Sequence, residues 1–149
     1  MAQAPPEVNE LHDAVKRGDL AAMRELLAAD NTLANARSET DPRGVYPLHV
    51  AAELGQAEAA RLLLEHGADP GLLDAQNAAT ALCWAAFHGR PAVLAVLPDT
   101  GINLRNKHGL TPLGCAIGGM QGHWSRFSNA STDDWRKITE MLRARGGVE

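Results

Sequence analysis

The chain has 149 residues, of which 45% are apolar and 21% are charged, a composition that favours one folded domain with a sizeable core. Its formal net charge of −4 argues against a general nucleic-acid binder, because such proteins normally carry a basic surface. No apolar run approaches the roughly 18 residues of a membrane span, and residues 1–8 do not resemble a signal peptide. We therefore expect a cytoplasmic protein with neither a nucleic-acid nor a membrane partner.

Four leucines, each followed three residues later by an alanine, mark the predicted elements. The pairs are Leu11/Ala14, Leu48/Ala51, Leu82/Ala85 and Leu113/Ala116, and successive leucines are 37, 34 and 31 residues apart. In the first three copies a glycine lies seven residues after the leucine, and a leucine-rich segment follows it. In chain order, this pattern predicts helices over 8–17, 20–29, 48–54, 58–66, 82–88, 91–97, 113–118 and 133–145.

The second copy carries the most complete motif. It begins Tyr46-Pro47-Leu48-His49-Val50-Ala51 and closes Gly67-Ala68-Asp69, and the fourth copy begins Thr111-Pro112-Leu113. These residues resemble the ankyrin repeat, which has a period of about 33 residues and the signature T-P-L-H-x-A. The resemblance covers residues 7–147, although Ala81, Cys83 and Gly114 depart from the usual Pro, His and His.

The resemblance implies an all-α ankyrin solenoid of about four helix-turn-helix repeats with terminal caps. Each unit has two short antiparallel helices that cannot bury their apolar faces alone, so neighbouring units must stack. The expected repeats cover 7–40, 41–74, 75–105 and 106–147 of a single domain spanning 1–149. Pro47 and Pro112 suit first helical positions, and Gly67 and Gly101 are expected to end second helices.

Two segments break the period. The connection between Asp30 and Gly44 is longer than usual and polar, which predicts a surface loop. In the last unit the closing glycine, Gly146, follows its leucine by 14 residues more than in the other units, which predicts an insertion near 119–133. The chain resembles small bacterial ankyrin repeat proteins that carry a Trp-containing insertion here. With Trp124 and Phe127 in it, this segment either caps the stack or walls a binding groove.

The histidines and cysteines have structural and chemical interpretations. At equivalent repeat positions, His12 and His49 are expected to hydrogen-bond across the turn and support stacking, as the resemblance implies. Cys83 and Cys115 lie in neighbouring helices, either as buried reduced thiols or as a redox pair or catalytic thiol. Neither a CxxC motif nor zinc-finger spacing is present, so no metal site and no cofactor is expected.

The resemblance also implies a partner surface on the concave side, formed by turn tips and the ends of the first helices. Leu54 and Phe87 are apolar at positions where a purely structural repeat tolerates polar side chains, which favours a binding role. The predicted partner-binding residues are Arg17, Arg43, Glu53, Leu54, Phe87, His88, His108, His123, Trp124 and Phe127.

The absence of the common catalytic motifs favours recognition over catalysis. The sequence has no phosphate-binding glycine loop, no GxSxG elbow and no HExxH pair. We expect a monomeric, non-catalytic module that binds another protein. The alternative is a small-molecule site or an enzyme, with a pocket between the concave face and the 119–133 segment. It would draw on Cys83, His88, His123 and Asp133, with His88 or His123 as the base, since an unperturbed histidine titrates near neutrality.

Overall fold

The computed structural model describes residues 6–149, and within that range it contains eight α-helices, one 3-10 helix and no strand. The α-helices are α1 (Pro6–Arg17), α2 (Leu20–Ala29), α3 (Pro47–Leu54), α4 (Ala57–Glu65), α5 (Ala81–His88), α6 (Pro91–Val96), α7 (Pro112–Met120) and α8 (Thr132–Ala144). This confirms the all-α prediction, and every helix end lies within two residues of its predicted position. Residues 1–5, part of the segment judged unlike a signal peptide, lie outside the described range.

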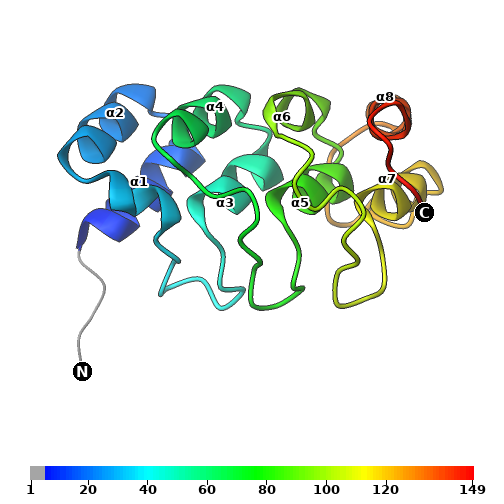
Figure 1. The fold of residues 1–149 in the computed structure, drawn as a ribbon, viewed down its shortest axis with the longest axis horizontal. Coiled ribbons are helices and arrows are strands. Elements are labelled where there is room, and N and C mark those ends of the chain that lie inside the picture. Colours follow the sequence, from blue (N-terminus) through cyan, green and yellow to red (C-terminus); the bar gives the residue numbers. More distant parts are fainter. Residues whose placement is uncertain (1–5) are drawn as a thin grey trace.

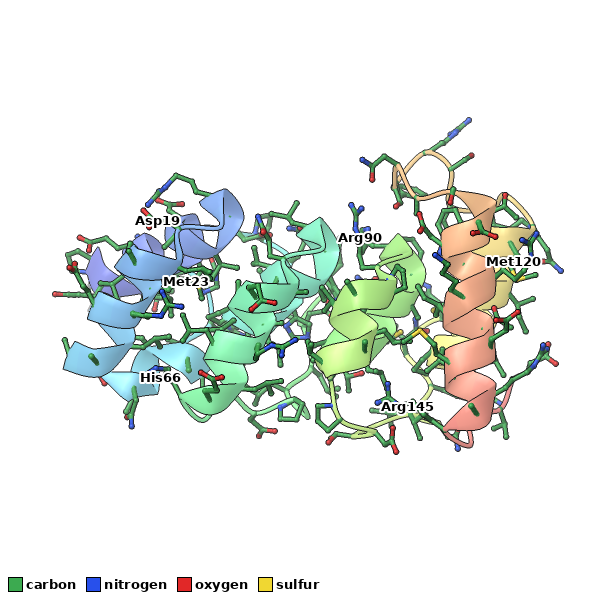
Figure 2. All side chains as sticks on the ribbon, turned by 90° about the horizontal axis from the view of Figure 1, so that it is seen from above. Asp19, Met23, His66, Arg90, Met120 and Arg145 are labelled. Carbon is green, nitrogen blue, oxygen red and sulfur yellow. The ribbon has the colours of Figure 1, made fainter. Side chains whose placement is uncertain are left out.

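The helices form two layers (Figure 1). One layer contains α1, α3, α5 and α7, and the other contains α2, α4, α6 and α8. Figure 2, seen from above, shows the second layer as a row of neighbouring helices. The long connections that precede α3, α5 and α7 project away from this row, so their tips extend beyond the first layer. No helix in the 6–149 range is long and apolar enough to cross a bilayer.

Local sequence explains where the first-layer helices begin and end. The hydroxyls of Thr80 and Thr111 cap α5 and α7 by accepting from the backbone N–H groups of Cys83 and Gly114. Pro47 and Pro112 occupy the first helical turn, where no backbone donor is needed. Gly55 ends α3 with a φ of 73°, a left-handed conformation that glycine adopts without steric cost.

Two histidines hydrogen-bond to the connections that lead to the next first-layer helix, which confirms their predicted structural role. The Nε2 atoms of His12 and His49 lie 2.9 Å from the carbonyl oxygens of Ala36 and Ala79. Because His49 Nδ1 accepts the backbone N–H of Tyr46 at 3.1 Å, its Nε2–H must donate to Ala79. This bond fixes the connection that leads into α5.

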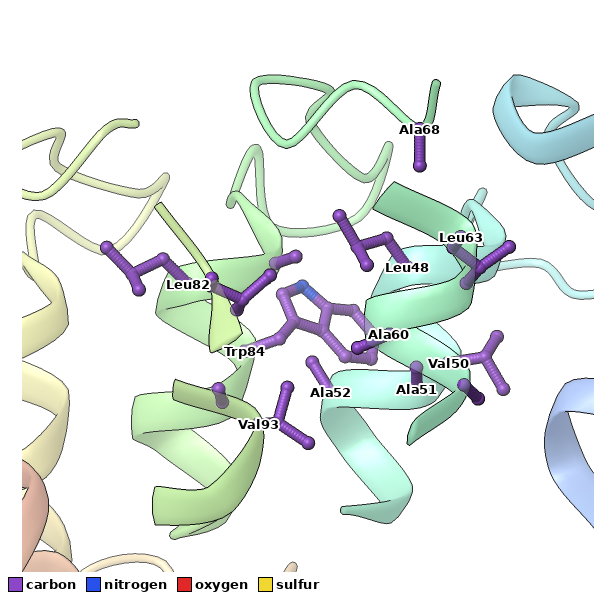
Figure 3. Packing of buried hydrophobic residues seen from close by; sticks show 14 of the residues in the cluster. Leu48, Val50, Ala51, Ala52, Ala60, Leu63, Ala68, Leu82, Trp84 and Val93 are labelled. Carbon is purple, nitrogen blue, oxygen red and sulfur yellow. The ribbon is translucent and has the colours of Figure 1, made fainter. Parts of the chain in front are cut away.

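The repeated leucine and alanine pairs form the centre of the core. All four leucines are buried, and the alanines that follow them are fully buried. Small side chains at these positions let the helices of adjacent repeats approach closely, while Leu63 and other large side chains fill the space between the layers. Figure 3 shows part of this core where α3 meets α5, with the indole of Trp84 at its centre.

Changing the size of a core side chain should destabilise the fold in either direction. Leu63→Ala should lower the free energy of unfolding by about 2 to 5 kcal/mol, because it leaves a cavity. Ala51→Leu should lower it by about 1 to 3 kcal/mol through overpacking. Urea unfolding followed by circular dichroism measures both effects. Leu104→Ala is the matched control, since Leu104 is 46% exposed. A loss from Leu104→Ala equal to that from Leu63→Ala would contradict this account of the core.

Two local predictions were wrong. The Asp30–Gly44 connection is not only a loop, because residues Asn31–Asn35 form a 3-10 helix that buries Leu33 and Ala34. Gly101 does not end a second helix, because α6 already ends at Val96. Pro98 is the reason: a proline disfavours helical backbone in the residue before it, and that residue is extended.

The connection inside the last helix pair is the longest of its kind. Between α7 and α8 lie residues 121–131, whereas residues 18–19, 55–56 and 89–90 make the corresponding connections in the other pairs. Ser128 Oγ donates to the carbonyl oxygen of His88 at 2.6 Å, and Asn129 accepts from Arg90 at 2.9 Å. The segment is therefore fastened to the end of α5, beside the first-layer helices.

Candidate functional site

A cavity of about 580 Å³ opens on the first-layer side of the fold, between the projecting connections and the segment that follows α7. Its lining combines four aromatic rings, one ion pair and several side chains from the tips of the connections. The lining residues are Arg43, Glu53, Gln76, Asn77, Ala79, Cys83, Trp84, Phe87, His88, Asn106, His108, Leu110, Trp124 and Phe127.

Three aromatic rings form one apolar wall of the cavity. The ring centroids of Phe87 and Trp124 are 4.7 Å apart, and those of Phe87 and Phe127 are 6.0 Å apart. The indole N–H of Trp124 donates to the carbonyl oxygen of Cys115 at 2.7 Å, which fixes this ring against α7. Phe127 is 62% exposed, so the wall ends in a large apolar side chain that faces solvent.

Trp84, which the sequence analysis did not single out, lies at the base of the cavity. It is 5% exposed, and its indole N–H donates to Asp74 Oδ1 at 3.0 Å. The buried Asp74 carboxylate also accepts backbone N–H groups of Asn77 and Ala79, so it fixes both the indole and the projecting connection. The sequence feature that could have indicated this role is a tryptophan two residues after the repeat leucine, at the position where the second copy has Val50.

At the charged edge of the cavity, the positive charge of Arg43 is paired with carboxylates of the same chain. Arg43 Nη1 lies 2.6 Å from Glu53 Oε2, and Arg43 Nη2 lies 2.9 Å from Asp41 Oδ2. The guanidinium also lies 5.1 Å from the ring centroid of Trp84, within the range of a cation–π contact. Hydrogen bonds to both carboxylates raise the pKa of Arg43, and the bond to Arg43 lowers the pKa of Asp41. With two carboxylates on this one guanidinium, an anionic ligand gains little from it.

His88 is neutral at physiological pH. Burial lowers its pKa to about 4, while the smaller effect of Glu53 raises this pKa and that of Arg90 lowers it further. Its ring centroid lies 5.0 Å from that of Phe87 and 5.7 Å from that of Trp84, so it extends the aromatic surface. The expectation that His88 titrates near neutrality is wrong, because that pKa holds for a solvated histidine and this ring is desolvated. A group with this pKa is a weak base.

The structure brings seven of the ten predicted partner-binding residues into this one cavity. The three that do not line it are at separate places. Arg17 is exposed near Asp19, Leu54 is 42% exposed at the end of α3, and His123 faces a smaller hollow of about 270 Å³ on the other side of Trp124.

The structure brings together only part of the catalytic group considered for the alternative function, which comprised Cys83, His88, His123 and Asp133. Cys83 and His88 line the cavity, whereas Asp133 pairs with Arg136 at the start of α8 and His123 belongs to the smaller hollow. In the described part of the chain, no group of three or more His, Cys, Asp and Glu side chains is placed to hold a metal ion.

Comparison with known proteins identifies the repeat. The family model described as ankyrin repeats (3 copies) matches residues 11–108. The putative E3 ubiquitin-protein ligase XBAT31 of Arabidopsis thaliana is 37% identical over 90 residues, which cover 60% of this chain and 19% of that protein. Rabankyrin-5 of Homo sapiens is 38% identical over 87 residues, which cover 56% of this chain and 7% of that protein.

A third relative matches over a longer stretch. The ARF GTPase-activating protein GIT1 of Homo sapiens is 31% identical over 135 residues, which cover 91% of this chain and 17% of that protein. The chain thus spans less than a fifth of the length of each of these three relatives. The family model covers the first three repeated leucines, and its match agrees with the paired helices, the capping Thr80 and the turn histidine described above. On these grounds the chain belongs to the ankyrin repeat family.

Proposed function

We propose that this chain is a non-catalytic recognition module that binds another protein through the cavity beside α3, α5 and α7. Ankyrin repeats generally serve as protein–protein interaction modules, which supports the class of function. The observation that carries the proposal for this cavity is its wall of Phe87, Trp124 and Phe127, which ends in a ring that is 62% exposed. Exposed aromatic side chains that border a hollow are typical of protein interfaces.

The charges of the cavity indicate what enters it. Its one arginine is paired with two carboxylates, and the half-buried His88 is neutral, so an acidic or phosphorylated anchor is disfavoured. Another part of the lining contains the side-chain amides of Gln76 and Asn77, at the tip of the connection that precedes α5. We therefore propose that a partner segment inserts an apolar or aromatic side chain against the wall, while its backbone hydrogen-bonds to these amides.

Peptide selection on the purified protein tests this proposal. Peptides isolated by phage display should share an aromatic or large aliphatic residue, and calorimetry should show at least about tenfold weaker binding to Phe127→Asp, or about 1.4 kcal/mol. Phe87→Asp should also abolish binding. Phe127 is the cleaner test, because Phe87 is half-buried and its loss could also perturb packing.

The matched control is Leu104→Asp, which places the same charge at an exposed leucine outside the cavity. It should leave peptide affinity unchanged, and both Asp variants should keep the wild-type circular dichroism spectrum. Selected peptides that bind Phe127→Asp as well as wild type, or that share an acidic anchor, would count against the proposed site.

One observation favours a second candidate, a small-molecule site. A volume of about 580 Å³ lies within the roughly 300 to 1,000 Å³ typical of ligand pockets. Catalysis by His88 gains no support, since its lowered pKa makes it a weak base. A fragment screen by NMR distinguishes the candidates. Compounds that shift the cavity resonances, together with a peptide selection that yields no binder, would favour the small-molecule reading.

A further inference from the structure

Two thiols from successive repeats meet beneath the cavity. Cys83 of α5 and Cys115 of α7 have their sulfur atoms 3.6 Å apart, and both thiols are free and buried. Their surroundings differ, because Cys83 lines the cavity and Cys115 does not. A small reagent that enters the cavity therefore reaches the sulfur of Cys83 first.

Hydrogen bonding distinguishes the two sulfurs further. The hydrogen bond with Cys83 and, to a smaller extent, burial raise the pKa of the Cys115 thiol, so Cys115 keeps its proton and donates it toward Cys83 Sγ. The side-chain amide of Asn106 lies nearer to the same sulfur, with Nδ2 3.7 Å from Cys83 Sγ and 4.0 Å from Cys115 Sγ. The Cys115 thiol and the nearer approach of the Asn106 amide stabilise negative charge on Cys83 Sγ, and the thiolate is the reactive form of cysteine.

We propose that Cys83 and Cys115 form a dithiol site that a hydroperoxide oxidises to a disulfide. Cys83 Sγ attacks the terminal peroxide oxygen, the O–O bond breaks, and the leaving alkoxide takes the thiol proton and departs as an alcohol, or as water from hydrogen peroxide. The product is a sulfenic acid on Cys83. Cys115 Sγ then attacks this sulfur and expels hydroxide, which takes the Cys115 proton and leaves as water. Two thiols and one hydroperoxide thus give one disulfide, one alcohol and one water.

Closing the bond also changes the cavity. The sulfurs must approach from 3.6 Å to about 2.0 Å, which draws α5 and α7 together locally. The carbonyl oxygen of Cys115 holds the indole of Trp124, and Trp84 directly follows Cys83 in α5. Oxidation therefore displaces two of the aromatic rings that line the cavity. The chemistry itself does not depend on what the cavity binds.

Oxidation of the purified full chain tests the site. After treatment with hydrogen peroxide, or with diamide as a second oxidant, the native protein should lose both titratable thiols and remain monomeric. Peptide mapping should recover the Cys83–Cys115 cross-link, and dithiothreitol should restore both thiols. Tryptophan fluorescence should change in parallel and recover on reduction.

Single variants test the assigned order of attack. In Cys115→Ala, peroxide should produce a sulfenic acid at Cys83 that dimedone traps, whereas in Cys83→Ala the remaining Cys115 should stay unmodified. Circular dichroism confirms that each variant is folded, and the wild-type measurement remains decisive if one is not. Thiols that react only after denaturation in guanidinium, or cross-links only between chains, would overturn the dithiol site. Trapping at Cys115 instead of Cys83 would overturn the order of attack.

Discussion

Replacing Trp135 by alanine should lower the free energy of unfolding by about 3 to 5 kcal/mol, the usual cost of deleting a buried tryptophan. Trp135 is 3% exposed, and its indole N–H lies 3.1 Å from the carbonyl oxygen of Ala86 and 3.2 Å from that of Phe87. It therefore joins the last helix, α8, to the end of α5. Its loss removes both a large apolar surface and the hydrogen bond across the repeat boundary.

The effect should be concentrated in the last helix pair. Repeat proteins are held together mainly by contacts between neighbours, so α7 and α8 should unfold at lower urea concentration than the preceding repeats. Far-UV circular dichroism together with hydrogen exchange measures both the loss and its location. Trp124→Ala is the matched control and should cost less, because Trp124 is only partly buried. Equal losses from the two variants would show that Trp135 has no special role in fastening α8.

Acidification from about pH 6.5 to about pH 4 should destabilise the protein by several kcal/mol. Burial lowers the pKa of His12, His49 and His88 below the usual 6.5, and that of His88 to about 4. Below pH 6.5 the unfolded chain binds protons that the folded chain does not, so the free energy of unfolding falls as the pH falls. At about 1.4 kcal/mol per unit of pKa shift, His88 alone accounts for roughly 3 kcal/mol.

The pH range over which stability is lost follows from the direction in which each pKa is shifted. The contribution of His88 is fully present above pH 6.5 and is lost by about pH 4, where the folded protein also becomes protonated. Asp41, whose pKa is lowered by Arg43, loses its stabilising effect only at still lower pH, below its usual 3.8. Urea midpoints at several pH values measure the profile. His88→Gln should reduce the pH dependence of the urea midpoint between pH 6.5 and 4, and an unchanged slope in that variant would contradict the assignment to His88.

The fold could be predicted from sequence because the signals that set it are local. A proline or a threonine starts α3, α5 and α7, a left-handed glycine ends α3 and α5, and the paired leucine and alanine define the buried face. Each signal acts within a few residues and recurs along the chain, so helix positions were predicted closely. Of the seven candidate residues around the cavity, the same register placed five, since turn tips and first-helix ends of successive repeats necessarily face the same side, and the other two, Trp124 and Phe127, came from the segment that breaks the period.

The repeat register does not predict those features of the site that depend on contacts between elements far apart in the chain. The role of Trp84 as the base of the cavity depends on Asp74, a carboxylate buried by the connection that precedes α5. The lowered pKa of His88 depends on burial, which no local pattern encodes. Gly118 and Gly119 are buried against the indoles of Trp124 and Trp135, which leave no space for a side chain at either position.

The sequence by itself thus determined the repeat, its helices and the face on which a cavity could form, because periodic local signals specify backbone conformation. Only the tertiary structure decided the chemistry of that cavity. The neutral histidine, the internally paired arginine and the adjacent thiols each result from neighbours that the folded chain brings within a few ångströms. Burial and hydrogen bonding by those neighbours set charge and reactivity, and neither can be read from the spacing of residues along the chain.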